Sequence, residues 1–217
     1  MKKTTEIVYQ NLFAELRNEY LGENNTILPM SPYKMRKKEM LRKHIDAMPS
    51  YSAAEMYKFE SGHQEKWREK VYDDERHSID TSIETLDFLN IVIFNISYIE
   101  RGTPSVQGLL VMAQYLRQQG DKVDFIKFEK WTRKLRISRL VSLLSSLLIE
   151  ILGFEAEELP YRFKLFPKAY LWLYLQITDF RQRTALQRTK TLYLFSPLAT
   201  LALWKKATQT ALDSIEE

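Results

Sequence analysis

The strongest concentration of charge in this 217-residue chain lies between residues 34 and 44. The run holds one acid, Glu39, and six cations: Lys34, Arg36, Lys37, Lys38, Arg42 and Lys43. A helix with such a run can lie along a nucleic-acid backbone, because each phosphate that it neutralises releases counterions. The run therefore predicts a phosphate-binding helix, with a solvated helix face as the alternative interpretation.

Two further basic stretches, 127–136 and 181–190, would extend this surface into a groove if all three stretches shared one face. In the first of them, Phe128 and Trp131 interleave with the cations. These aromatic residues are spaced as core residues of a helix, so the surrounding cations also fit an ordinary outer face.

Metal chemistry has few candidate ligands in this sequence. The three histidines, His44, His63 and His77, are too far apart in the chain to form a common helical metal-ligand pair. Asp74 could join His63 and His77 around a metal, but an exposed polar turn is the simpler interpretation. We therefore predict no metal site and no cofactor.

Nucleophilic catalysis is equally poorly supported. The chain has no cysteine and no G-x-S-x-G elbow, and its few glycines form no phosphate-binding loop. Ser142, Ser145 and Ser146 lie in an apolar segment, where we expect them to pack closely or to bond back to helix carbonyls. The sequence predicts no catalytic residues, so we expect a protein that is not an enzyme.

The elements that position these groups are predicted to be helices. Apolar residues recur at spacings of three and four, and only 6 glycines occur. We expect an all-α fold in which residues 1–217 form a single domain of about seven to nine helices. The polar segment 73–80 marks a sub-boundary within that domain.

The sequence also indicates where several helices begin and whether one ambiguous segment is a helix or a strand. Ser31 before Pro32, Asp124 and Ser138 are placed to cap helices. Residues 89–97 are rich in branched and aromatic side chains that suit a buried strand, but the length of the apolar run from 83 to 99 favours a buried helix.

Composition sets the environment. Hydrophobic residues make up 45% of the chain and charged residues 28%, as in ordinary globular proteins. The most apolar stretch, 140–152, is about half the roughly 20 residues of a membrane helix, and the first residues lack the pattern of a secretory signal. Without cysteines the chain fits a reducing compartment, so we expect a cytoplasmic protein that does not enter the membrane.

A series of features between Leu86 and Phe163 combines charged turns, aromatic helix starts and a glycine-aromatic helix end. They are Glu100-Arg101-Gly102, Tyr115-Leu116, Asp124-Phe125 with Phe128 and Arg139, Leu152-Gly153-Phe154 and Leu159-Pro160. In this order they resemble the helical C-terminal part of a family of bacterial nucleotidyltransferase-like proteins.

The resemblance implies a helical fold and no activity. Catalysis in that family would use a Gly-Ser turn and a following Asp-x-Asp pair in an N-terminal α/β part, and this sequence has neither. Gln107 and Val111 stand where the family often has an arginine and an aspartate, and Asn95 stands near the position of its histidines.

Taken together, these patterns predict a non-catalytic helical binding or assembly module that forms a homo-dimer or binds another protein. Tyr170, Trp172 and Tyr174 cannot all face one core on a helix, so they are candidates for an exposed interaction patch. The alternatives are a nucleic-acid-binding protein that uses residues 34–44 and a divergent nucleotidyltransferase-like protein without its catalytic motif.

Overall fold

The computed structural model describes residues 3–47, 69–73, 75–76, 83–100 and 103–178, and all regular structure in these residues is helical. The all-α prediction is therefore confirmed for this part of the chain. The α-helices that the structure describes from end to end are α1 (Lys3–Leu21), α2 (Pro32–Asp46), α5 (Ile83–Glu100), α6 (Val106–Gln119), α7 (Phe125–Lys134), α8 (Ser138–Leu152) and α9 (Ala169–Thr178). Two short 3-10 helices, η1 (Gly120–Lys122) and η2 (Ala156–Glu158), lie between them.

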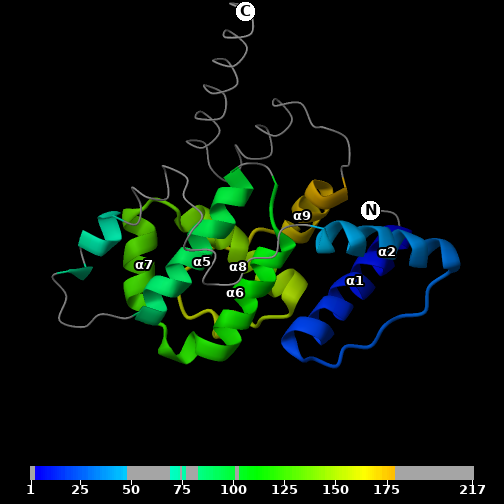
Figure 1. The fold of residues 1–217 in the computed structure, drawn as a ribbon, viewed down its shortest axis with the longest axis horizontal. Helices are drawn as coiled ribbons and strands as arrows, with labels where there is room; N and C mark the ends of the chain where they lie inside the picture. The colour runs from blue at the N-terminus through cyan, green and yellow to red at the C-terminus, as the bar shows by residue number, and fades with distance from the viewer. Residues whose placement is uncertain (1–2, 48–68, 74, 77–82, 101–102, 179–217) are drawn as a thin grey trace, which may run out of the picture.

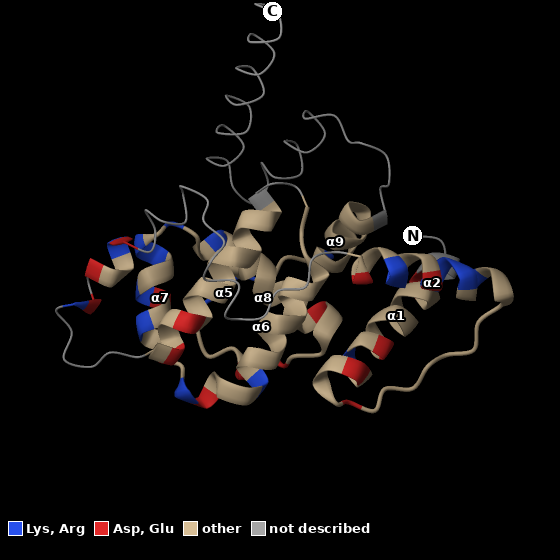
Figure 2. Ribbon diagram, viewed as in Figure 1, with Lys and Arg blue, Asp and Glu red and all other residues tan. Residues whose placement is uncertain are grey.

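The helices α5, α6 and α8 form the middle of the structure (Figure 1). Helix α7 lies at one end, and α1 with α2 lies at the other. Lysines and arginines occur on α7 and on α2, so both ends carry positive charge (Figure 2). The predicted sub-boundary at 73–80 falls largely outside the described residues, and the single domain stays a prediction.

Helix α5 is the central element of the core. Its side chains from Phe88 to Ser97 are all buried, and it contacts α6, α7 and α8. A helix that is apolar on every side can satisfy its own backbone while its whole surface packs against neighbours. The helical interpretation of 89–97 is therefore confirmed over the strand alternative.

The crossing of α5 and α6 is fixed by one buried amide. The Asn95 side chain donates from Nδ2 to the carbonyls of Ile91 and Gly108, both at 3.0 Å. Its Oδ1 atom lies 2.5 Å from the position that a Cβ atom would take at Gly108. The close approach therefore requires glycine at position 108, and the Asn95 side chain bonds to the backbone of both helices.

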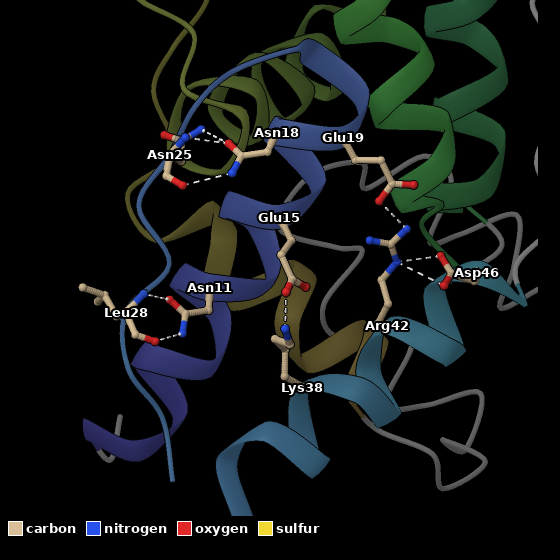
Figure 3. A network of polar contacts seen from close by, with 9 residues as sticks. All are labelled: Asn11, Glu15, Asn18, Glu19, Asn25, Leu28, Lys38, Arg42 and Asp46. Carbon is tan, nitrogen blue, oxygen red and sulfur yellow. Dashed lines mark hydrogen bonds and ion pairs between the residues drawn. The ribbon is translucent and has the colours of Figure 1, made fainter. Parts of the chain in front are cut away.

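The connection between α1 and α2 is held along α1 by two asparagines that are two turns apart (Figure 3). Asn11 donates to the Leu28 carbonyl at 2.7 Å and accepts from the Leu28 amide at 2.8 Å. Asn18 pairs in the same way with the backbone of Asn25, at 3.0 and 2.6 Å. Each side-chain amide thus satisfies both polar groups of one loop residue.

Segment 162–168, here called the strap, lies along α8 and leads into α9. Its alternate amides donate to α8 side chains: Lys164 to Ser142 Oγ at 3.1 Å and Phe166 to Ser146 Oγ at 2.9 Å. Glu150 then accepts from the amides of Lys168 and Tyr170, at 3.1 and 2.9 Å. The acceptors are four residues apart on the helix, so the strap follows one face of α8.

The serines of α8 have a second bond each, as their sequence context predicts. Ser142, Ser145 and Ser146 donate to carbonyls four residues earlier, at 2.9, 2.9 and 2.8 Å. Because the Ser145 proton is used in this way, the buried Tyr161 hydroxyl donates to Ser145 Oγ at 2.9 Å. Burial raises the pKa of Tyr161, so this donor keeps its proton.

The predicted caps have different outcomes. Asp124 accepts from the Lys127 amide at 2.9 Å, so its prediction is confirmed. Ser31 precedes Pro32, the first residue of α2, without a side-chain capping bond. The prediction for Ser138 is wrong, because Ile137 precedes the helix and its carbonyl accepts from the amides of Leu140 and Val141.

We predict that Gly108→Ala destabilises the protein by about 1–3 kcal/mol, because the new methyl group overlaps Asn95 and forces the helices apart. Urea unfolding of the variant and wild type measures the difference. Gly120→Ala is the matched control, since a Cβ atom there meets nothing within 4 Å. Equal stability of the Gly108 variant and wild type would contradict the close approach.

Candidate binding face on α2

The predicted phosphate-binding cations lie on α2, but two of them point toward α1 (Figure 3). Lys38 forms an ion pair with Glu15. Arg42 pairs with Glu19 at 2.8 Å and with Asp46 at 2.8 Å. These two cations are therefore neutralised by acids, and they serve to dock α2 on α1.

The electrostatics of Arg42 agree with this docking role. Burial alone would lower the pKa of its guanidinium, but the hydrogen bonds that Arg42 donates to Asp46 and Glu19, and the charges of these two acids, outweigh burial, so the pKa is raised. The guanidinium is thus stabilised in its charged form by groups of the protein itself.

The other four predicted cations, Lys34, Arg36, Lys37 and Lys43, form no ion pair with a residue that the structure describes. Arg36 and Lys43 are exposed, and Lys34 and Lys37 are half-buried. Their charge is therefore available to a partner, whereas that of Lys38 and Arg42 is already balanced.

Large exposed hydrophobic side chains accompany these cations. Tyr33 is 71% exposed and Met40 is 62% exposed. At 100° per residue, Tyr33, Arg36, Lys37, Met40 and Lys43 fall within about 120° of one another around the helix axis, and we call them the α2 outer face. The inner side of the same helix buries Leu41 and Ile45.

Sequence reasoning missed the apolar half of this face, although a helical projection of residues 33–43 would have revealed it. Ile27 and Leu28, in the connection that leads to α2, are also exposed, at 41% and 43%. An exposed surface that combines apolar and charged side chains is typical of a protein interaction site.

The predicted interaction patch on α9 is less exposed than expected from the sequence. Tyr170, Trp172 and Tyr174 are all half-buried, and all three pack against the core. This is possible because α9 contacts both α2 and α8, while the Tyr174 ring meets Tyr9 of α1 with centroids 4.2 Å apart. The premise that they cannot share one core is therefore wrong, and their role in partner binding stays a prediction.

A hollow of about 310 Å³ lies between α1, the end of α8 and the start of α9. It is lined by Glu6, Tyr9, Gln10, Phe13, Arg17, Glu150, Ile151 and Tyr170. Both Glu150 oxygens accept backbone amides, and burial, with a smaller contribution from Tyr174, raises the pKa of Tyr9. Glu150 is therefore a structural group, and the Tyr9 hydroxyl stays protonated near neutral pH.

The second basic stretch lies on α7, at the opposite end of the structure from α2 (Figure 2). The first two stretches therefore do not line one groove, and the third, 181–190, lies outside the described residues. His63, Asp74 and His77 also lie outside them, and no group of described side chains is arranged to hold a metal ion. No described helix has the length and apolar character needed to cross a membrane.

Charge reversal tests the docking role of Lys38. We expect Lys38→Glu to destabilise the fold by about 1 kcal/mol, because it sets two carboxylates against each other, and Glu15→Lys in the same chain to restore most of the loss. Urea unfolding of the two single variants and the double variant gives the coupling. The control Arg36→Glu, which breaks no ion pair of the described residues, should change stability by less than about 0.5 kcal/mol.

Comparison with protein families, with curated proteins and with solved structures gives no match to this chain. The resemblance to nucleotidyltransferase-like proteins over residues 86–163 therefore stays a prediction.

Proposed function

We propose that the protein is a non-catalytic helical binding module and that the α2 outer face binds a partner protein. The observation that supports this proposal is that exposed Tyr33 and Met40 share one face of α2 with three cations that form no ion pair with a described acid. Aromatic residues, methionine and arginine are the types enriched at the centres of protein interfaces.

The chemistry of the face defines the partner. Tyr33 and Met40 offer apolar area that a bound partner would cover, and Arg36, Lys37 and Lys43 are complementary to carboxylates on that partner. A matching surface therefore has apolar side chains flanked by aspartate or glutamate. A second copy fits this face less well, because a two-fold dimer would set the cations of one copy against those of the other.

Rigid presentation supports the same role. The Asn11 and Asn18 pairs hold the segment before α2, and the Lys38 and Arg42 ion pairs hold α2 itself against α1. A partner that binds the outer face therefore does not need to order this helix, which lowers the entropic cost of association.

A helical peptide with leucine on one face and glutamate on the flanks tests this proposal by fluorescence anisotropy. We expect it to bind the wild type, and we expect the double substitution Tyr33→Ser with Met40→Ser to weaken binding about tenfold through lost apolar contact. Circular dichroism should show unchanged helicity, since both side chains are exposed.

Two controls separate apolar recognition from charge alone. Ile126→Ser removes an 85% exposed side chain on α7 and should leave peptide binding unchanged. A scrambled peptide of the same composition should bind more weakly than the amphipathic one. Equal binding of both peptides, or equal loss in the Ile126 variant, would contradict a binding face on α2. A preference of this face for an oligonucleotide over the peptide would support the nucleic-acid alternative instead.

A further inference from the structure

A second positively charged surface lies at the opposite end of the molecule, where α7, the start of α8 and the strap meet. We call it the basic strip and define it by Lys130, Arg136, Arg139, Arg162 and Lys164, all of which are exposed. The residues between 127 and 139 include six cations and one acid, and those between 161 and 168 include three cations and no acid.

Backbone bonds bring the strap, which carries two of these cations, against the helices that carry the others, although the segments are distant in the chain. The Arg162 amide donates to the Glu129 carboxylate of α7 at 3.4 Å, next to Lys130. The Lys164 amide donates to Ser142, one helical turn beyond Arg139. The strap therefore adds its two cations to those of α7 and α8.

The strip differs from α2 in its balance of charge. On α2 the acids of α1 neutralise two cations. In the strip, Glu129 is paired with Arg133, which is not a strip residue, and the five strip side chains form no ion pair with any described residue. The uncompensated charge is therefore concentrated on an exposed surface that the α7–α8 turn and the strap hold in place.

The backbone supplies an independent observation. Helices α1 and α8 are followed by Gly22 and Gly153 in the left-handed region, with φ of 68° and 72°. After α7, the residue in the left-handed region is Arg136, two residues past the end of the helix, at φ 59°, and a side chain at that φ is strained. A cation is thus present where glycine would favour the fold, which suggests a use for its charge.

We propose that the basic strip binds the phosphate backbone of a nucleic acid. Five unpaired cations on three packed segments, α7, the start of α8 and the strap, fit a polyanion, and lysine and arginine are side chains that bind phosphate oxygens. The proposal assigns nucleic-acid binding to this end of the molecule and is independent of protein binding by α2.

Anisotropy titrations with a labelled single strand of about 20 nucleotides, as DNA and RNA, and with the matching duplex test the proposal at about 50 and 200 mM salt. We expect affinity to fall steeply with salt. The triple substitution Lys130→Gln, Arg139→Gln and Arg162→Gln should weaken binding at least about tenfold and reduce the salt slope by about three. The matched control is Arg36→Gln, Lys37→Gln and Lys43→Gln on α2, which should keep wild-type affinity.

Arg136→Gly gives a second, opposed readout. Relief of the left-handed backbone should raise Tm by about 2–4 °C, while loss of the charge should weaken nucleic-acid binding. If the variant is more stable and yet binds nucleic acid less tightly, unfolding cannot account for the loss of affinity.

Three results would overturn the proposal. They are an absence of salt-dependent binding by the wild type at low salt, an equal loss of affinity in the two triple variants, and a loss confined to the α2 variant.

Discussion

The structure depends on side chains of the helices that form hydrogen bonds with the backbone of segments lacking regular secondary structure. Backbone amides that leave a helix still need acceptors, and the strap obtains them from Ser142, Ser146 and Glu150. Four helical residues advance about 6.0 Å, and two extended residues advance about 6.6–6.8 Å. The near match lets alternate strap amides meet successive turns of α8, and the longer Glu150 side chain reaches the last strap amide, that of Lys168, and the amide of Tyr170 in α9.

The α2 outer face and the basic strip both depend on such segments. The strap carries Arg162 and Lys164 to the basic strip, and Glu150 fixes the start of α9. At the other end, Asn11 and Asn18 hold the connection from which α2 starts, and this orients the α2 outer face. The protein thus has a helical core with α5 at its centre, with the proposed protein-binding face at one end and the proposed phosphate-binding strip at the other.

Local and periodic features were predictable from the sequence. The helical interpretation of 89–97 follows from the length of the apolar run, and the Asp124 cap follows from a rule about one residue and its next turn. The back-bonding of the α8 serines is of the same kind. The prediction that Ser138 caps α8 was wrong because the buried Ile137 precedes the helix instead. The burial of Ile137 depends on tertiary packing, which the local sequence does not reveal.

Long-range pairing was not predictable in the same way. The strap amides lie about 20 residues from their acceptors, and nothing in the types of Lys164 or Phe166 marks their backbone as donors. One signal was available for the α2 cations, since Glu15 and Glu19 on α1 have the same four-residue spacing as Lys38 and Arg42. Matching the two spacings would have separated the docking cations from the free ones.

Amide hydrogen exchange along the strap, resolved residue by residue by NMR, tests the central claim most directly. If α8 side chains hold the strap in this register, the amides of Lys164, Phe166 and Lys168 exchange slowly, and those of Phe163 and Leu165, which have no acceptor in the described structure, exchange faster. Uniformly fast exchange from 163 to 168, or protection of the odd-numbered amides, would contradict the account.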